Sequence, residues 1–288
     1  MIVASIPSPS SGTLSIGPLR LTAYGLMIAL GIVAAVWLAG RRLESGRAGN
    51  RDDMSSIAVW AVVGGVAGAR LYHVATDWSR FSDDLGRIPL IWKGGLGIPG
   101  GLVGGVVVGF FAARRRGVAF PALLAAVAPA IPLAQSIGRW GNWWNQELFG
   151  RATDLPWALE ISDENLPAGY TPGTTFHPTF LYESVWNLAL CVALLQIERR
   201  WTLRPGRLFA FYLVGYFTGR VWIEGLRIDP AHVIGPLRLN QWVSIAVVVA
   251  AVGYLVVDRR RFRATRRETS EESPATLRRS DRTSFLRR

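Results

Sequence analysis

Cysteine and histidine are scarce in this chain of 288 residues. The single cysteine, Cys191, cannot form an internal disulfide, which excludes a small disulfide-stapled scaffold. One cysteine and three histidines form no cluster of metal ligands, so we expect no metal site. The patterns Gly-x-Ser-x-Gly and His-Glu-x-x-His and a Walker-type phosphate loop are also absent. These absences argue against a serine hydrolase, a zinc protease and an ATP-driven pump.

Charge is also low, at 18% of the residues, where a soluble domain carries about 25%. Residues 258–288 alone hold 11 arginines and 5 acids, so the remainder is about 14% charged. Half of the chain is apolar, which excludes disorder for most of it. The net charge of +12 lacks the interleaved aromatics of a nucleic-acid surface, so we expect no nucleic-acid partner. We interpret the charge as a feature of membrane topology.

Seven long apolar runs fill the first 257 residues. Each has about 16 to 21 residues, which suits a helix crossing a hydrocarbon core about 30 Å thick. Lipid leaves backbone amides no partner outside a helix, so the runs predict an all-α integral membrane protein with seven transmembrane helices in the bilayer. The predicted spans are Tyr24–Ala39, Met54–Val74, Leu96–Ala113, Pro121–Ile137, Phe180–Ile197, Leu208–Ile223 and Leu239–Val257.

The arginines and the one lysine are distributed unequally between the connecting segments. Of the 32, 22 lie in the tail and the segments after spans one, three and five, eight lie on the other side, and Arg70 and Arg220 fall within spans. The positive-inside rule therefore places the N-terminus outside and the tail in the cytoplasm. Residues 1–257 form the predicted membrane domain, 150–178 an extracytoplasmic insertion between helices 4 and 5, and 258–288 a basic tail that we expect to be disordered.

A dense polar segment, Gly138-Arg139-Trp140-Gly141-Asn142-Trp143-Trp144-Asn145-Gln146-Glu147-Leu148-Phe149-Gly150, follows the fourth span on the outer side. Its glycines permit sharp turns and close backbone approach. Its asparagine amides and Glu147 can hold a guanidinium in place. A re-entrant turn with satisfied hydrogen bonds is the structural alternative.

Further polar residues lie where spans one, five and six reach the outer side. Arg220 and Glu224 are four residues apart on one helical face, which suits either an ion pair or a site. His177 and Glu183 flank the start of span five, and each alone could be a satisfied structural residue. Tyr24 begins span one, where an interfacial anchor is the alternative.

Arg139 and Arg220 lie on different predicted helices at a similar depth. Two guanidiniums near a lipid interface need an anion. The carboxylates Glu147, Glu183 and Glu224 could supply part of that charge, and a phospholipid phosphodiester is the abundant external anion at this depth. The residues alone thus predict a protein that holds a lipid headgroup at its outer leaflet.

The segment Gly138–Gly150 resembles the signature of the prolipoprotein diacylglyceryl transferases, Gly-Arg-x-Gly-Asn-(aromatic)-x-Asn-x-Glu-x-x-Gly, and matches every fixed position. The resemblance covers most of residues 18–257, including Tyr24-Gly25-Leu26-Met27 and the block from His177 to Glu183. It implies transfer of the diacylglyceryl group from phosphatidylglycerol to the lipobox cysteine thiol of a prolipoprotein signal peptide. Glycerol 1-phosphate would be released at the outer leaflet of the bacterial cytoplasmic membrane, with no cofactor.

The same resemblance assigns expected roles to individual residues. Arg139 and Arg220 are the expected catalytic arginines, and Glu147 is a further catalytic candidate. Arg139 is also expected to bind substrate, and the other expected substrate-binding residues are Tyr24, Asn142, Asn145, Gly150, His177, Tyr216 and Glu224. One position departs from the family pattern, because Pro99 stands where the family often has histidine. The proline side chain cannot accept a proton, so we expect no general base at that position.

A membrane transporter or lipid flippase is the alternative from a different class. A transporter of this kind would also have several spans, charged residues within the membrane and glycine-rich helices. Such a protein would show broken helices at corresponding positions of two halves and a site near the midplane. The sequence has one polar segment at one interface without a second copy. An envelope scaffold, the third possibility, leaves the arginine, asparagine and glutamate constellation unexplained.

Overall fold

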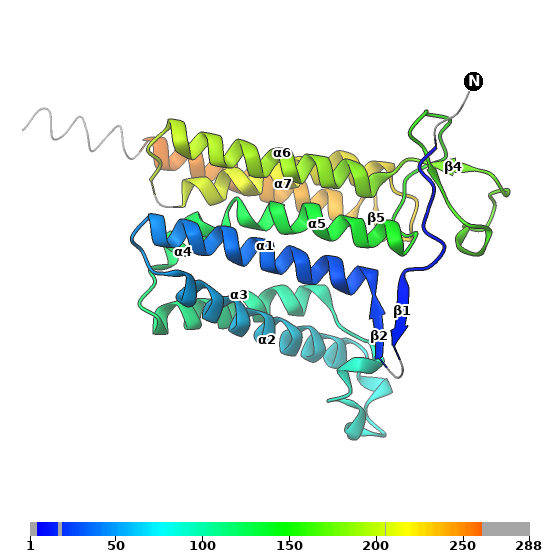
Figure 1. The fold of residues 1–288 in the computed structure, drawn as a ribbon, viewed down its shortest axis with the longest axis horizontal. Helices are drawn as coiled ribbons and strands as arrows, with labels where there is room; N and C mark the ends of the chain where they lie inside the picture. The colour runs from blue at the N-terminus through cyan, green and yellow to red at the C-terminus, as the bar shows by residue number, and fades with distance from the viewer. Residues whose placement is uncertain (1–4, 17–18, 205, 261–288) are drawn as a thin grey trace, which may run out of the picture.

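The computed structural model describes residues 5–16, 19–204 and 206–260, and these form an elongated bundle of helices lying roughly parallel to one long axis (Figure 1). One end carries the short hairpins and the connecting segment between α5 and α6 (Figure 1). We call this end the site end and the opposite end the basic end. The helices are α1 (Ala23–Ser45), α2 (Arg51–Thr76), α3 (Ile98–Arg115), α4 (Phe120–Val127), α5 (Ala130–Trp144), α6 (Thr179–Arg200), α7 (Arg207–Leu226) and a final helix, Leu239–Arg260.

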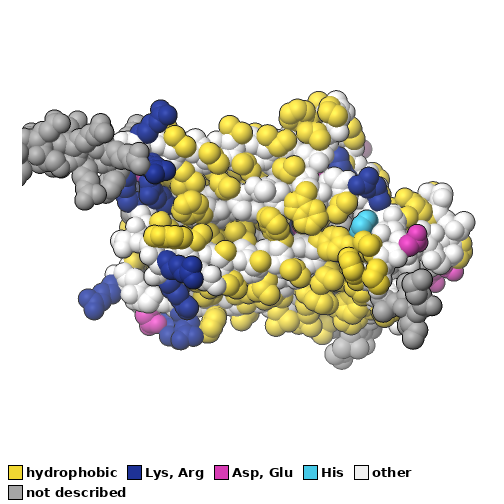
Figure 2. All heavy atoms as spheres, turned by 90° about the horizontal axis from the view of Figure 1, so that it is seen from above, with side chains coloured by type: hydrophobic (Ala, Val, Ile, Leu, Met, Phe, Trp, Pro, Cys, Tyr) yellow, Lys and Arg dark blue, Asp and Glu magenta, His cyan; other side chains and the backbone are white. Residues whose placement is uncertain are grey.

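Five of these helices are long and apolar enough to cross a membrane, namely α1, α2, α3, α6 and the final helix. A sixth span is obtained if α4 and α5 are counted together. The apolar side chains form a broad band, with arginines gathered at the basic end and mixed charges at the site end (Figure 2). The structure is thus consistent with a helical integral membrane protein. α7 has 20 residues but is not among the candidate spans.

The predicted fourth span is broken. α4 ends at Val127, α5 begins at Ala130, and the two axes differ by 42°. The guanidinium of Arg42 donates to the carbonyls of Ala125 and Ala126 near the break, which satisfies groups that a helix end leaves without partners. α5 then continues to Trp144, so the first half of the polar signature is helical rather than a loop.

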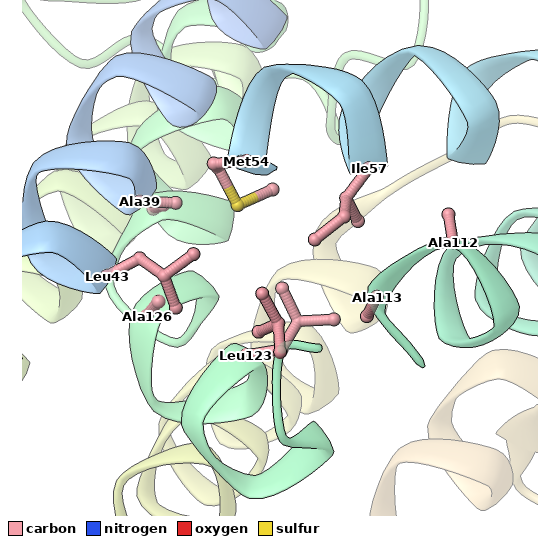
Figure 3. Packing of buried hydrophobic residues seen from close by; sticks show 10 residues of the cluster. Ala39, Leu43, Met54, Ile57, Ala112, Ala113, Leu123 and Ala126 are labelled. Carbon is pink, nitrogen blue, oxygen red and sulfur yellow. The ribbon is translucent and has the colours of Figure 1, made fainter. Parts of the chain in front are cut away.

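Helices α2 and α3 pack closely through glycines. A Cβ on Gly100 or Gly104 would lie 2.3 Å from the carbonyl oxygen of Gly68 or Gly64, so only glycine permits this approach. Toward the basic end, a core of small and aliphatic side chains joins α2 and α3 to α1 and α4 (Figure 3). Its labelled members are Ala39, Leu43, Met54, Ile57, Ala112, Ala113, Leu123 and Ala126.

The site end is covered by short elements outside the helices. The hairpins are β1 (Thr13–Ile16) with β2 (Leu19–Thr22), β3 (Leu159–Glu160) with β4 (Thr175–Phe176), and β5 (Val233–Ile234) with β6 (Leu237–Arg238). The 3-10 turns are Trp78–Arg80, Leu85–Arg87, Ile91–Lys93 and Asp163–Asn165. Residues 150–178 contribute Leu159, Ile161 and Phe176 to a buried cluster with Phe149 and Phe180, which fixes this insertion on the start of α6.

The final helix extends three residues beyond the predicted boundary at Val257. Asp258 accepts from Arg204 and Arg207, which ties the helix to the segment before α7. Residues 261–288, most of the predicted disordered tail, lie outside the described part of the chain.

Candidate functional site

The C-terminal half of α5 presents the first part of the signature to its neighbours. Asn142 is buried, and Arg139 Nη1 donates to its Oδ1 over 3.4 Å. A Cβ on Gly141 would lie 2.7 Å from the ring of Tyr24, so the glycine lets α1 and α5 meet at the site. Two expected site residues from distant parts of the sequence, Tyr24 and Asn142, are thereby brought to the same turn of α5.

A tight turn follows α5 and carries the rest of the signature. Gln146 and Leu148 both adopt positive φ values, 50° and 61°, which non-glycine residues seldom do. Hydrogen bonds hold this backbone: Gln146 donates to the Pro9 carbonyl and accepts from the Ser162 amide, and the Thr179 hydroxyl donates to the Leu148 carbonyl. The surrounding structure therefore over-determines a strained segment, as is common at functional sites.

The carboxylate of Glu147, which lies in this turn, accepts from the side-chain amides of Asn142 over 2.8 Å and Asn145 over 3.2 Å. It thus orients both asparagines, and it reaches Arg139 only through Asn142. The carboxylate that pairs with Arg139 directly is a different one.

Glu183 of α6 joins the two expected catalytic arginines. Its Oε2 lies 2.6 Å from Nη2 of Arg139, and its Oε1 lies 3.2 Å from Nη1 of Arg220. The prediction that Glu183 satisfies a neighbouring arginine is confirmed, and it does so for both. Glu183 is only 4% exposed, so the two arginines meet its carboxylate in an environment of low polarity. Each charge interaction is strong there.

Glu224 is the second centre of the network and is fully buried. Its carboxylate lies 2.6 Å from Nη2 of Arg220, so the ion pair, one of the two alternatives for this spacing, is formed. It also lies 3.6 Å from Nη1 of Arg227 and 3.3 Å from Nε of Arg238, and it accepts from Asn240 over 3.2 Å. Three guanidiniums therefore share one buried carboxylate.

Asp229 completes the network beyond the end of α7. Arg227 donates to both of its oxygens over 2.7 and 2.9 Å, and Arg238 lies 3.1 Å away. Burial opposes ionisation of this carboxyl, but the hydrogen bonds and charges of Arg227 and Arg238 outweigh it and lower the pKa of Asp229. It is therefore a fixed negative charge at neutral pH.

The charges of this connected network do not balance. Arg139, Arg220, Arg227 and Arg238 face Glu183, Glu224 and Asp229. Four guanidiniums against the three carboxylates that pair with them directly leave a formal charge of +1 among mostly buried groups. Glu147 is a further carboxylate nearby, but it is exposed and reaches Arg139 only through Asn142. A buried charge without a partner is costly, so this arrangement is suited to binding an anion.

Gly150, the last residue of the signature, connects the network to the insertion. It forms an isolated antiparallel bridge with Arg227, and its amide donates to the His177 carbonyl over 2.9 Å. A Cβ here would lie 2.8 Å from that of His177, so glycine is required by close approach. Burial and the charge of Arg151 lower the pKa of His177, whose Nδ1 lies 3.1 Å from the Tyr182 hydroxyl. His177 is therefore neutral at pH 7.

Tyr216 is placed less directly than the other expected site residues. It lies one helical turn before Arg220 on α7 and stacks on Tyr212 at 5.8 Å between ring centroids. It packs on aromatic rings and against a cluster of buried apolar residues, and none of these described contacts joins it to the arginine network. Cys191 is buried in α6, which agrees with a packing role, and within the described ranges no group of three or more metal-ligating side chains occurs.

Two members of the network, Arg238 and Asn240, were missed by the sequence reasoning. They lie at the end of β6 and the start of the final helix. The signal was a run of polar residues at the entry of the seventh apolar stretch. In the sequence, Arg238 looks like one more charge in a connecting segment, so this run does not stand out.

The chain is similar to known proteins over most of its length. The sequence profile of the prolipoprotein diacylglyceryl transferase family matches residues 11–257. Similar proteins bearing the name phosphatidylglycerol–prolipoprotein diacylglyceryl transferase occur in several bacteria. The chain is 48% identical to that of Streptomyces griseus, over 89% of this chain and 78% of the relative. It is 48% identical to that of Cutibacterium acnes (90% and 88%) and 44% identical to that of Rhodococcus jostii (97% and 79%).

Proposed function

The chain belongs to the prolipoprotein diacylglyceryl transferase family and is a transferase, and we propose that it moves the diacylglyceryl group of phosphatidylglycerol to the lipobox cysteine of prolipoproteins. The observation that carries this proposal is the arginine network with its surplus positive charge. A phospholipid phosphodiester supplies the missing negative charge. The names of the relatives identify the donor lipid and the acceptor protein.

In the proposed reaction, the thiolate sulfur of the acceptor cysteine attacks the carbon of the diacylated glycerol unit that is bonded to the phosphate oxygen. The carbon–sulfur bond forms as the carbon–oxygen bond breaks, and the electron pair leaves with the phosphate. Glycerol 1-phosphate is released, and the thiol proton passes to water or to a carboxylate. A free thiol has a pKa near 8.5, so only a fraction of it is thiolate at neutral pH. The positive potential of the network raises that fraction.

Arg139 and Arg220 stabilise the negative charge that develops on the leaving phosphate. Glu183 aligns both guanidiniums before the lipid arrives, so little reorganisation is needed during the reaction. Asn142, Asn145 and Glu147 form the adjoining polar wall, and Tyr24 closes the site from α1. Gly150 and His177 hold the insertion against Arg227, while Tyr216 lies one turn deeper, at the level of the lipid chains.

We further propose seven spans, with α4 and α5 as one broken span and α7 as the sixth. The basic end lies in the cytoplasm of the bacterial cell, and the N-terminus, residues 150–178 and the site face outward. The unequal distribution of arginine supports this orientation. Single cysteines at Asp154 and Ser45 in a Cys191→Ser background test it. An impermeant thiol reagent should label the first in intact cells, whereas labelling of Ser45→Cys alone would reverse the orientation.

The transfer itself is tested with the purified full chain in detergent, phosphatidylglycerol labelled in its acyl chains, and a lipobox peptide. We expect a labelled thioether on the cysteine and one glycerol 1-phosphate per transfer, with no product from a peptide carrying serine in place of the cysteine. Lipid movement across vesicles without thioether formation would support the transporter instead. The structure gives that alternative little support, because the network that centres on fully or nearly buried carboxylates lies at the site end. The cluster of Arg204, Arg207 and Asp258 at the other end is smaller and partly exposed.

A further inference from the structure

An apolar groove runs between α1 and α2 at the half of the bundle remote from the site. It has a volume of about 670 Å³ and opens sideways to the surroundings. Apolar side chains of both helices line most of it, among them Ile32 and Val36 of α1 and Ala58, Val59 and Val62 of α2. Val59 is 62% exposed, so in a membrane these walls face lipid.

The groove is closed by cationic groups at its basic end. Arg51 and Ser55 line this end together with Trp37. The guanidinium of Arg41 lies 4.9 Å from the centroid of the Trp37 ring, directly beside the groove. Arg51 pairs with Glu44 over 2.7 Å, but both partners are about half exposed, so solvent weakens this pair. The guanidiniums of Arg41 and Arg51 therefore both lie at the mouth, where the phosphate of a lipid can reach them.

The length of the groove matches one leaflet. On α2 it extends from Arg51 to Val63, and twelve residues of helix rise about 18 Å. Half of a hydrocarbon core about 30 Å thick is about 15 Å. A transmembrane peptide helix would need the whole thickness, so the groove fits a lipid chain from one leaflet better than a protein segment.

We propose that this groove binds an acyl chain of an anionic phospholipid, whose phosphate is held by Arg41 and Arg51. The ligand belongs to the leaflet at the basic end and is separate from the donor lipid at the arginine network. Its chain fills the opening between α1 and α2 where the small residues Ala29 and Ala58 leave room. The proposal does not depend on the transfer reaction.

The test uses the full chain in nanodiscs containing phosphatidylglycerol with a diazirine in the middle of one acyl chain. After irradiation, the crosslinked residues are mapped by mass spectrometry. We expect crosslinks to concentrate on residues 29–37 and 55–63. Phosphatidylcholine with the same chains should compete weakly, because each basic residue near the surface contributes about fivefold to the binding of an anionic lipid.

Two kinds of variant separate the headgroup from the chain. Arg41→Gln with Arg51→Gln should lower the apparent affinity about 25-fold, and Val33→Phe with Val59→Phe should abolish crosslinks in the groove. The matched controls are Arg199→Gln and Val185→Phe; Val185 is 60% exposed, close to the 66% of Val33. Equal crosslinking of all lipid-facing helices, or equal competition by phosphatidylcholine with no effect of the arginine variant, would overturn the proposal.

Discussion

Arg70 and Arg220 both lie within apolar helices near the site end, yet their surroundings differ. Arg70 of α2 is bound to its own chain: it donates to the carbonyls of Arg87, Ile88, Gly94 and Gly95 and lies 5.1 Å from the Phe81 ring centroid. Arg220 of α7 instead binds carboxylates that other arginines share.

We propose that this difference separates a structural arginine, Arg70, from a functional one, Arg220. The guanidinium of Arg70 donates all of its described hydrogen bonds to neutral backbone carbonyls. These bonds fix the segment between α2 and α3. The network around Arg220 holds more guanidiniums than carboxylates, so it lacks one negative charge. An intramembrane arginine is a functional hypothesis by default, and its partners decide whether that hypothesis holds.

The largest expected effect comes from truncating the arginines that share Glu183. Arg139→Ala and Arg220→Ala should each reduce transfer by about 10²–10³, because a preorganised donor at developing charge is lost. Lysine at either position should rescue poorly, since it lacks the planar fork that grips two oxygens. Transfer of labelled diacylglycerol to a lipobox peptide measures this.

The matched controls for these variants are Arg115→Ala and Arg199→Ala. Both side chains are exposed at the basic end, so turnover should stay near wild type. Wild-type turnover in either site variant would remove that arginine from the mechanism.

Arg238 tests whether a network arginine that does not contact Glu183 also matters for transfer. It pairs with Glu224 and Asp229 instead. Arg238→Gln should lower kcat/KM about tenfold, since a hydrogen bond to a charged group contributes about 1.5–3 kcal/mol. Glu224 would then bind Arg220 more tightly and hold it away from the lipid. Arg238→Lys should recover part of the loss. An unchanged kcat/KM in Arg238→Gln would show that Glu224 needs no third guanidinium.

Arg70→Gln should act on stability rather than on turnover. Its four carbonyl partners would lose their donor, at a cost of about 1–3 kcal/mol, which corresponds to a fall in Tm of about 2–10 °C in detergent. Protein that remains folded should transfer lipid at nearly the wild-type rate. A full loss of turnover at unchanged Tm would place Arg70 with the functional arginines.

Pro99 should show the smallest effect. It lies in the first turn of α3, where proline suits a helix start and alanine is tolerated. Pro99→Ala should therefore keep most of the activity. Inactive wild-type protein that regains transfer on Pro99→His would contradict this and would identify a required base at that position.

Much of this arrangement was predictable from the sequence, because hydrophobic runs and charge determine which segments lie in lipid. The seven predicted apolar stretches coincide with α1, α2, α3, the α4–α5 pair, α6, α7 and the final helix. The break at Ala128–Pro129 was missed because the predicted span was drawn from hydropathy alone, although Pro129 has no backbone N–H to continue a helix. In α3 and at its N-cap, a Cβ on Gly97, Gly100 or Gly104 would lie 2.3 Å from an atom of α2, whereas a Cβ on Gly101, Gly105 or Gly109 would lie 3.3 Å away. Periodicity alone does not say which face meets a neighbour.

The site was predicted as a set of residues but not as a set of contacts. The sequence placed Arg139 and Arg220 at a similar depth, and the shared carboxylate of Glu183 confirms that they meet. Glu147 seemed equally able to hold Arg139, yet it binds the asparagines. The pairing of carboxylates with arginines depends on how each helix is rotated about its axis and on the turn at Gln146. Residue spacing in the sequence predicts neither of these.

The most direct test of the account measures kcat and KM separately for Arg220→Gln, at saturating peptide and over a range of phosphatidylglycerol concentrations. The account predicts that kcat falls about 10²–10³ and KM changes little, because the arginine acts on charge that develops as the phosphate leaves. A wild-type kcat with a raised KM would contradict it, because Arg220 would then only bind the lipid.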